Sequence, residues 1–213
     1  MEGSIISKFK KTFLSESPMN IGKGHTDMCQ WLSTIINEFI INNFHPIQLD
    51  EHYYKLEIKD EIFYWYTDQN KIILAISLEK QPYALIVRNL GKDIKYANKK
   101  PFAYELFEII LNDQKIPIRL MSDESMTIDG FKNWEKLFDI GYKIYIYNNR
   151  NNNAGQSLKQ LQSKNEMEEF FKTEKQYGDW QYVISESSGI ENIIGPFGLR
   201  RIRELSGQVD RDS

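Results

Sequence analysis

Three potential metal ligands, His25, Asp27 and Cys29, stand at alternate positions near the N-terminus. Imidazole, carboxylate and thiolate groups all bind zinc, which usually takes four protein ligands at a structural site. Residues two apart at the start of a helix point to different sides, and no second Cys or His cluster completes the set. The pattern therefore favours capping and packing roles over a zinc site.

Two other reactive patterns lie in the same region. Gly22-Lys23-Gly24 resembles part of a phosphate loop, but the upstream Gly of G-x-x-x-x-G-K-[ST] is missing and Gly24 follows the Lys. Cys29 as a nucleophile would need a base, and His45 and His52 are distant in the sequence. We expect neither a phosphate loop nor a cysteine nucleophile here.

Carboxylates and tyrosines are the remaining groups suited to proton transfer. A carboxylate can act as a general base directly or through water, although carboxylates at strand ends are commonly only solvated. The candidate carboxylates are Glu51, Glu57, Glu61 and Glu79. Tyrosines in strands pack across the sheet more often than they catalyse. The tyrosines are Tyr64, Tyr66, Tyr142, Tyr145 and Tyr147.

Periodicity predicts the elements that would position these side chains. Thr26–Asn43 has apolar residues at helical spacing, with Thr26 suited to the N-cap. Alternating, aromatic-rich stretches separated by short polar turns then predict an antiparallel meander. They are Tyr53–Ile58, Ile62–Thr67, Ile72–Leu78 and Tyr83–Val87.

Helices alternate with strands in the next segment. Pro101–Asn112 begins with a proline, and Thr127–Phe138 places Trp134 in an apolar stripe behind a Thr cap. Ile116–Met121 and the stretch ending at Tyr147 read as strands. The fold class predicted is α/β (α+β), with a central mixed sheet, an antiparallel meander followed by β-α-β-α-β, and helices on both faces.

Composition bounds the class of protein. The 213 residues are 41% hydrophobic, which suits one domain with a substantial core. A net charge of −3 gives no global reason to expect nucleic acid as a partner. The single Cys29 excludes an internal disulfide, and Met1–Phe13 lacks the apolar core of a signal peptide. We expect a cytoplasmic or virion-associated protein with no membrane partner.

The composition changes after Tyr147, where Asn148–Asn153 reads as a polar link. We expect residues 1–149 to form the core with its N-terminal helix and residues 150–213 to form an extension that packs on the same domain. In this extension Met167–Phe171 suits a helix and Trp180–Ser185 a strand that completes the sheet. Basic amphipathic segments are predicted at the two ends of the chain, over Ile5–Leu14 and Pro196–Leu205.

The span from about Tyr83 to Tyr147 resembles the core of the GNAT superfamily of acyl-CoA-dependent N-acyltransferases, particularly divergent branches often found in phage genomes. In that family one strand splays from its neighbour, and a glycine-containing loop with the following helix N-terminus holds the cofactor pyrophosphate. A later helix carries a Tyr beside the thiol leaving group. The likeness lies in the order and spacing of elements and covers roughly a third of the 213 residues.

The resemblance implies acetyl-CoA as cofactor and an amine as acceptor. The residues that it implies as cofactor-binding are Val87, Asn89, Lys95, Asn98, Lys99, Lys100, Phe102 and Ala103. In the family, glycines of the pattern Gln/Arg-x-x-Gly-x-Gly/Ala let backbone N–H groups approach the phosphates closely. This pattern is absent here and Pro101 lacks an N–H, so the charges of Lys95, Lys99 and Lys100 would partly replace those backbone contacts. The candidate catalytic residues are Glu57, Glu61, Trp134 and Tyr145. Trp134 stands where the family has Tyr, and its indole does not titrate, so one of the five tyrosines named above, Tyr145 among them, is the alternative acid.

Three functions follow as hypotheses. The first is an active N-acyltransferase. The second is a catalytically inactive structural or interaction protein of the same fold, for instance in a phage particle, with protein partners or as a homo-oligomer. The third is a small nucleic-acid-associated or regulatory factor, with nucleic acid an unlikely partner on overall charge. Its basic residues would be Lys8, Lys10, Lys11, Lys99, Lys100, Arg200, Arg201 and Arg203.

Overall fold

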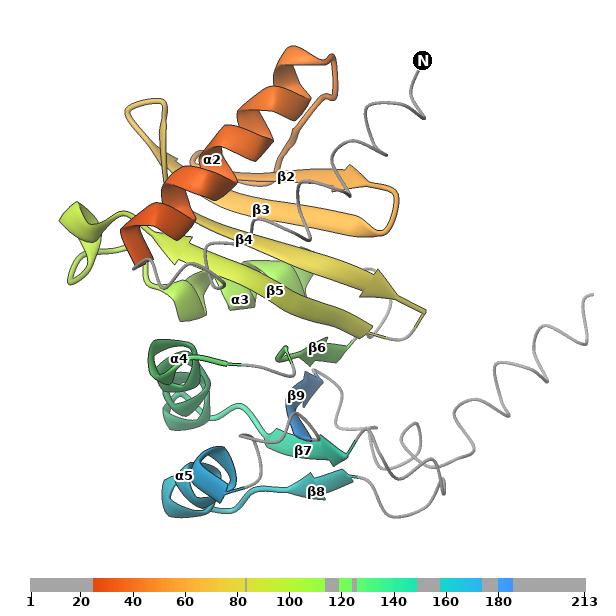
Figure 1. Cartoon of the computed structure of the whole chain (residues 1–213), viewed down its shortest axis with the longest axis vertical. Helices are drawn as coiled ribbons and strands as arrows, with labels where there is room; N and C mark the ends of the chain where they lie inside the picture. Colours follow the sequence, from red (N-terminus) through yellow and green to blue (C-terminus); the bar gives the residue numbers. More distant parts are fainter. Residues whose placement is uncertain are drawn as a thin grey trace, which may run out of the picture. The chain divides into compact units, whose positions relative to one another are not determined.

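The computed structural model describes residues 25–82, 84–113, 119–123, 126–148, 158–173 and 180–185 (Figure 1). The helices of these residues are α2 (His25–Ile41), the 3-10 helix η2 (Ile94–Tyr96), α3 (Ala103–Asp113), α4 (Ile128–Asp139) and α5 (Lys164–Thr173). The strands are β1 (Ile47–Gln48), β2 (Tyr53–Ile58), β3 (Glu61–Asp68), β4 (Lys71–Gln81), β5 (Ala84–Lys92), β6 (Arg119–Met121), β7 (Ile144–Asn148), β8 (Leu158–Gln160) and β9 (Trp180–Ser185).

The strands form one mixed sheet in the order β1-β2-β3-β4-β5-β6-β9-β7-β8. β2 pairs antiparallel with β3, whereas β5 pairs parallel with β6. The predicted α/β class with a mixed sheet is therefore confirmed, as is the joining of β9 to the sheet. The sequence did not place β9 between β6 and β7, where it runs antiparallel to both.

The chain forms two compact units. Unit 1 comprises Met1–Leu78 and Arg88–Leu106, and unit 2 comprises Glu79–Val87 and Phe107–Ser213. β4, β5 and α3 each contribute residues to both units.

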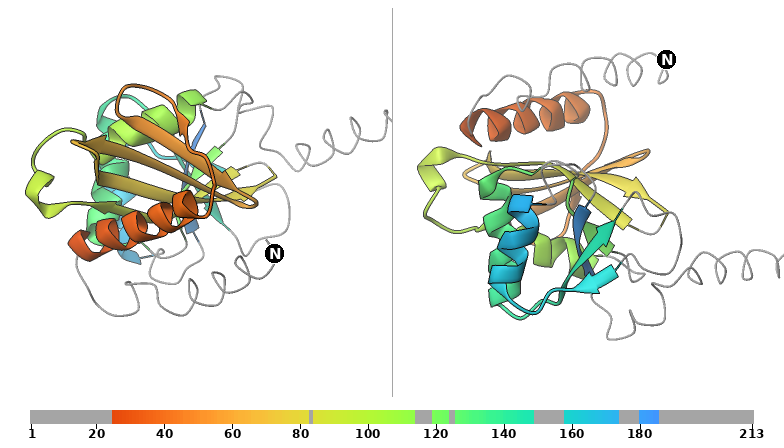
Figure 2. Two further views of the ribbon diagram at one scale, coloured as in Figure 1. Left: turned by 90° about the horizontal axis from the view of Figure 1, so that it is seen from above. Right: turned by 60° about the horizontal axis from the view of Figure 1, so that its bottom comes forward.

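In unit 1, α2 crosses one face of the strands, from the end of β5 to β2 (Figures 1 and 2). Its apolar stripe buries Leu32, Ile36 and Phe39 against alternate residues of the strands, such as Leu56 and its cross-strand partner Phe63. The predicted helix is thus confirmed, although it begins at His25 and contains Thr26, the residue predicted to cap it. Burial of this stripe holds α2 in place.

Two glycine-like backbone positions shape the hairpin from β3 to β4. Gln69 and Asn70 both have positive φ, 47° and 63°, and they form the whole loop between Asp68 and Lys71. A two-residue loop with both φ values positive matches the right-handed twist of paired strands. The turn predicted at Asp68–Asn70 is therefore confirmed, and it fixes which end of β3 meets the start of β4.

In unit 2, α4 is the predicted capped amphipathic helix. Thr127 is the N-cap, and its Oγ1 accepts a hydrogen bond from Gly130 N at 3.1 Å. The predicted apolar stripe consists of Phe131, Trp134, Leu137 and Phe138, of which the first three are buried and Phe138 is half-buried. Both the cap and the buried stripe are confirmed.

The strand β9 links the helices of unit 2 to the sheet. Phe131 and Trp134 of α4 contact the ring of Tyr182, whose Oη donates to Met167 O of α5 at 2.8 Å. Burial raises the pKa of the Tyr182 hydroxyl. Gln181 faces the other way and donates to Ser122 O at 2.6 Å, so both sides of β9 are fixed.

Other predicted segments fall outside the described residues. These are Ile5–Leu14, Pro196–Leu205 and all but Asn148 of the polar link Asn148–Asn153. Within the described ranges, no helix is both long and apolar enough to cross a membrane.

Candidate functional site

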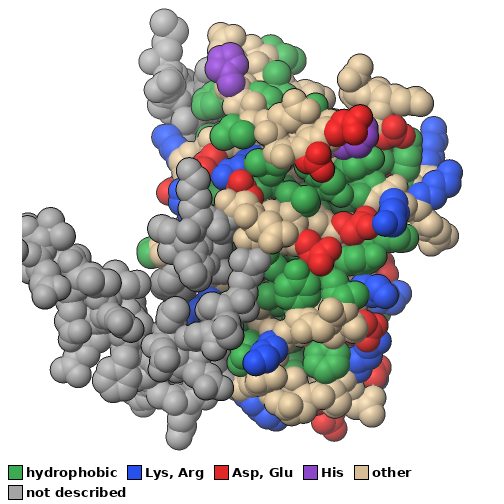
Figure 3. Space-filling model, turned by 180° about the vertical axis from the view of Figure 1, so that it is seen from behind, with side chains coloured by type: hydrophobic (Ala, Val, Ile, Leu, Met, Phe, Trp, Pro, Cys, Tyr) green, Lys and Arg blue, Asp and Glu red, His purple; other side chains and the backbone are tan. Residues whose placement is uncertain are grey.

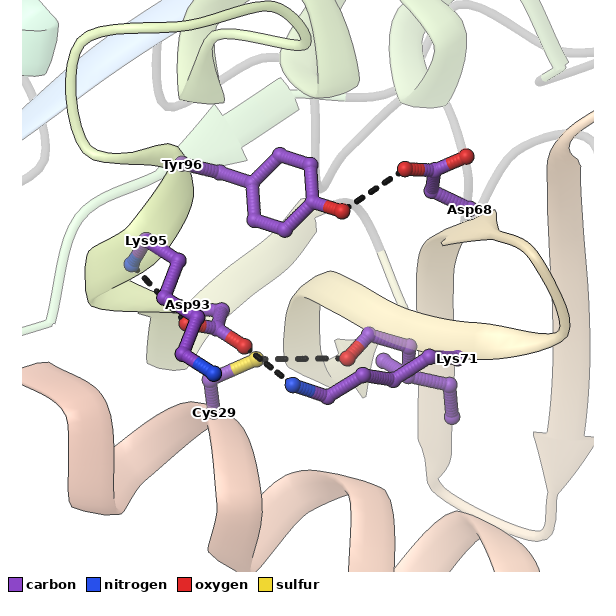
Figure 4. A network of polar contacts seen from close by, with 7 residues as sticks. Cys29, Asp68, Lys71, Asp93, Lys95 and Tyr96 are labelled. Atoms are coloured by element: carbon purple, nitrogen blue, oxygen red, sulfur yellow. Dashed lines mark hydrogen bonds and ion pairs between the residues drawn. The ribbon is translucent and has the colours of Figure 1, made fainter.

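The candidate cofactor residues from Lys95 to Ala103 lie around the start of α3, in a loop that is anchored to the sheet through Asp93 (Figure 4). Asp93 is buried, its N–H donates to Ile73 O at 2.8 Å, and its carboxylate accepts from Lys95 N at 2.9 Å. Lys71 Nζ pairs with the same carboxylate, and this contact holds the pKa of Asp93 below its usual value. The loop after β5 therefore leaves the sheet in one defined direction.

A carboxylate of the chain itself occupies the N-terminus of α3. Phe102 N–H donates to Glu105 Oε2 at 2.7 Å, and Lys100 Nζ lies 3.2 Å from Glu105 Oε1. This is one half of a capping box, in which the third helical residue satisfies the N–H of the cap residue. Glu105 thus fills the position at the positive end of the helix dipole where an anion is best stabilised.

The lysines around this helix start also have partners within unit 1. Lys92 Nζ donates to Lys99 O at 2.6 Å and lies 4.9 Å from the centre of the Phe102 ring. Burial lowers the pKa of Lys92. Lys99 Nζ lies 5.9 Å from the ring centre of Tyr96. We call Lys92, Lys99, Lys100, Phe102 and Glu105 the α3 cluster.

A second contact ties η2 to the end of β3. Tyr96 Oη donates to Asp68 Oδ2 at 2.7 Å, and this hydrogen bond raises the pKa of the Tyr96 hydroxyl (Figure 4). Asn98 is exposed in the loop between η2 and α3, and Ala103 is the first residue of α3. The residues predicted at the cofactor from Lys95 to Ala103 therefore lie together around the start of α3.

Asn89 lies on the opposite face of β5. A side chain on Gly91 would come within 2.4 Å of Cys29 N, so this residue faces α2, whereas the next residue, Lys92, faces Phe102. Alternation along the strand places Asn89 on the same side as Gly91. Asn89 and the α3 cluster are therefore not brought together on one face, and Val87 belongs to unit 2.

The two candidate carboxylates lie at the far end of β3 from the α3 cluster. Glu61 begins β3, and Glu57 stands opposite Ile62 with its carboxylate 3.7 Å from Lys55 Nζ. Asp68 ends β3 and contacts Tyr96. At about 3.3 Å per residue, Glu61 is on the order of 20 Å from Asp68. The structure does not bring these carboxylates to the start of α3.

The two candidate acids of unit 2 lie on opposite faces of its strands. Trp134 is 2% exposed and packs between Phe107 and Tyr182, with ring centres 6.0 Å and 5.9 Å away. Tyr145 of β7 stands opposite Val183 of β9 and packs with it on the face of these strands that is opposite Tyr182. Trp134 is thus placed as a core residue, and Tyr145 is half-buried.

Sequence reasoning missed Glu105, Lys92 and Ser77. Glu105 stands three residues after Phe102, but Phe lacks the side-chain oxygen of the Ser or Thr that marks a capping box in a sequence. Nothing local marks Lys92, since its ring partner is ten residues away in the sequence. Ser77 is hydrogen-bonded to Asn89 across two strands, which only the sheet register reveals.

The chain showed no match in comparisons with protein-family models, with curated proteins and with solved structures. In the part of the chain that the structure describes, no three His, Cys, Asp or Glu side chains are grouped closely enough to hold a metal ion.

Proposed function

We propose that this chain is a GNAT-type N-acyltransferase that uses acetyl-CoA as its acyl donor. The observation that carries the proposal is the pairing of β5 with β6. These parallel strands are joined through α3, and their ladder extends only over Ala84–Ile86 and Arg119–Met121, whereas β5 continues to Lys92. A strand that leaves its neighbour just before a helix N-terminus fits the splayed strand of the family.

The position of β9 supports the same proposal. This strand lies near the C-terminal end of the described residues and inserts beside β6, antiparallel to it. A late strand that completes the sheet is common in the family. The order of the elements, with α2 and the meander before the β-α-β-α-β segment and β9 after it, supports the proposal.

The α3 cluster is the part of unit 1 suited to the phosphates of acetyl-CoA. Lys99 and Lys100 are exposed and carry the positive charge that such a ligand needs. Phosphate oxygens would also accept the Phe102 N–H, but this requires Glu105 to give up both of its present contacts. The residues fit an anion only after that exchange. Acetyl-CoA would supply an activated acyl group for attack by an amine.

Glu105 also favours a second candidate function, an interaction or structural protein that has kept the fold without the chemistry, for instance in a phage particle. A carboxylate bound at the start of α3 opposes phosphate binding. Trp134, at the place of the family's Tyr, is buried in an aromatic cluster. In this alternative the partners are proteins or further copies of the chain.

On the face shown in Figure 3, acidic and basic side chains are interspersed in the described part of the chain. A continuous basic surface is the usual footprint of nucleic-acid binding. The view therefore offers no support for the nucleic-acid hypothesis, while the ends of the chain fall outside the described residues.

Isothermal titration calorimetry with acetyl-CoA tests the proposal. Saturable binding by the wild type supports the acyltransferase, and the double variant Lys99→Glu/Lys100→Glu should abolish it with little change in melting temperature. The control is Lys132→Glu/Lys143→Glu, which changes the same charge at exposed positions of unit 2. If the wild type gives no heat at millimolar acetyl-CoA, the acyltransferase is wrong and a partner should be sought by pull-down.

A further inference from the structure

One polar pair interrupts the most apolar strand of the sheet. Residues 72–78 of β4 are all buried, and Ser77 is the single polar residue among them. Its Oγ accepts a hydrogen bond from Asn89 Nδ2 of β5 at 2.9 Å. A Ser in such a strand gives up the packing that Ile or Val would provide, and this hydrogen bond satisfies its buried hydroxyl.

The pair lies on the face of the strands that α2 covers. Ala75, two residues before Ser77, belongs to the core cluster that α2 forms with the sheet. Gly91, two residues after Asn89, is in contact with the α2 backbone at Met28 and Cys29. Alternation along each strand therefore gives Ser77 and Asn89 the same face. It is the face opposite the α3 cluster.

The hydrogen bond to Ser77 orients the Asn89 carboxamide. Because Nδ2 is directed at Ser77, Oδ1 is the free end of the amide. Within the described ranges no donor is hydrogen-bonded to Oδ1, and Asn89 is half-buried. This oxygen is therefore the end of the carboxamide that can accept an N–H brought by a ligand.

We propose that Asn89 Oδ1 accepts a hydrogen bond from the amine that is acylated, and that Ser77 is a positioning residue that holds the carboxamide in this orientation. The inference rests on the proposed acyltransferase and assigns its acceptor side to the α2 face of β5. The acceptor is an amine, as the proposed function requires, and Oδ1 accepts one N–H of its neutral form. The amine nitrogen forms the C–N bond as the C–S bond of the thioester breaks, and the released thiolate takes up the proton that the nitrogen loses. The phosphates of the acyl donor would lie on the other face, at the α3 cluster.

Steady-state transfer from acetyl-CoA to three amine probes, spermidine, tyramine and Nα-acetyl-lysine, tests this assignment through release of the free thiol. Asn89→Leu should raise the KM for the amine about tenfold or more, with the KM for acetyl-CoA unchanged, because only the acceptor loses a hydrogen bond. Asn89→Asp keeps an oxygen acceptor and should retain the wild-type KM for the amine. Ser77→Ala should raise that KM by a smaller factor, and Ser77→Thr, which keeps the hydroxyl, should restore it.

The matched control is Asn42→Leu, the same change at an exposed position just after the end of α2, where the side chain donates to Glu38 O. It should leave both KM values unchanged. A parallel readout is the NMR signal of the Asn89 side-chain NH2, assigned through Asn89→Asp, which should shift when the amine is added.

The outcomes separate the two proposals. If acetyl-CoA binds but Asn89→Leu leaves the KM for the amine unchanged, or if none of the three amines is acylated and none shifts the Asn89 signal, this inference is overturned and the proposed function stands. If the wild type does not bind acetyl-CoA at all, the proposed function fails, and this inference fails with it.

Discussion

Glu105→Gln separates the charge at the start of α3 from the hydrogen bond that the same side chain accepts. Gln can still accept the Phe102 N–H, because capping boxes use Glu or Gln, but it removes the negative charge beside Lys100. We therefore expect the helix start to persist while the site becomes more favourable for an anion. The variant tests competition between Glu105 and phosphate directly.

The magnitude follows from Coulomb's law. A carboxylate and a phosphate oxygen about 5 Å apart repel by roughly 3 kcal/mol at an effective dielectric constant near 20. The Glu105 side chain is 20% exposed, and part of this repulsion is relieved when the carboxylate turns toward water. An increase in acetyl-CoA affinity of about tenfold, or roughly 1.4 kcal/mol, is a reasonable expectation.

Calorimetry with acetyl-CoA and urea unfolding followed by circular dichroism measure the two effects. Glu105→Gln should bind more tightly with nearly unchanged stability, since exposed ion pairs contribute little. Glu105→Ala should lose about 0.5–2 kcal/mol of stability because the cap is gone. Glu108→Gln, one turn further along α3, is the control for charge alone. If Glu108→Gln strengthens binding as much as Glu105→Gln does, general charge and not the α3 start decides affinity, and the reasoning is refuted.

Three further predictions concern stability. Trp134→Ala should lower the free energy of unfolding in urea by about 3–5 kcal/mol, as for other buried aromatic residues. Ile128→Ala on the same helix should lower it by less than about 0.5 kcal/mol, because Ile128 is 65% exposed. Gly91→Ala should cost about 1–3 kcal/mol, since its methyl group would lie 2.4 Å from backbone. Gly130→Ala should cost less, because its methyl group would meet only side-chain atoms, those of Met126 at 2.8 Å and Thr127 at 3.4 Å. Because the pKa of Asp93 is lowered in the folded state, its carboxylate contributes fully to the free energy of unfolding above a pH of about 4, and this contribution is lost as the pH falls. In Asp93→Asn the free energy of unfolding should therefore decrease less steeply between neutral and acidic pH. The same pH dependence of the unfolding free energy in the variant and the wild type would contradict the prediction for Asp93.

The parts of the fold that were predicted correctly are those with local signals. Thr127 at the cap and the buried face that includes Trp134 follow from a 12-residue pattern, and the structure has both. The same holds for the turn at Gln69–Asn70, where two short polar residues adopt positive φ. In each case the decisive contacts are within a few residues of one another.

The parts that were missed depend on pairing over long distances. β1 and β8 have only two and three residues, too few to show a period. β9 inserts between β6 and β7 because Val183 meets Met121 on one side and Tyr145 on the other. No stretch of sequence near β9 encodes that choice of neighbours, which is made by complementary apolar faces.

The candidate site shows the same division. Lys95–Ala103 were placed together correctly, because they are consecutive in the chain and precede a recognisable helix. Glu57 and Glu61 were named as candidate bases because they lie in the meander, and the length of β3 separates them from the α3 cluster. Asn89 was assigned to the cofactor, yet strand alternation places it on the α2 face, opposite that cluster.

Glu105 makes the two candidate functions alternative outcomes of one local competition. The Phe102 N–H and the Lys100 ammonium can serve either the carboxylate or a phosphate, and the carboxylate has the advantage of being attached to the same helix. A ligand must therefore bring enough additional contacts to offset this local concentration. Acetyl-CoA can do so only if its remaining atoms also bind β5, so a shortened analogue such as inorganic pyrophosphate should bind far more weakly than acetyl-CoA if the chain is an acyltransferase. Equal, weak binding of the two would mean that the helix start belongs to Glu105 and that the fold serves a partner other than acetyl-CoA.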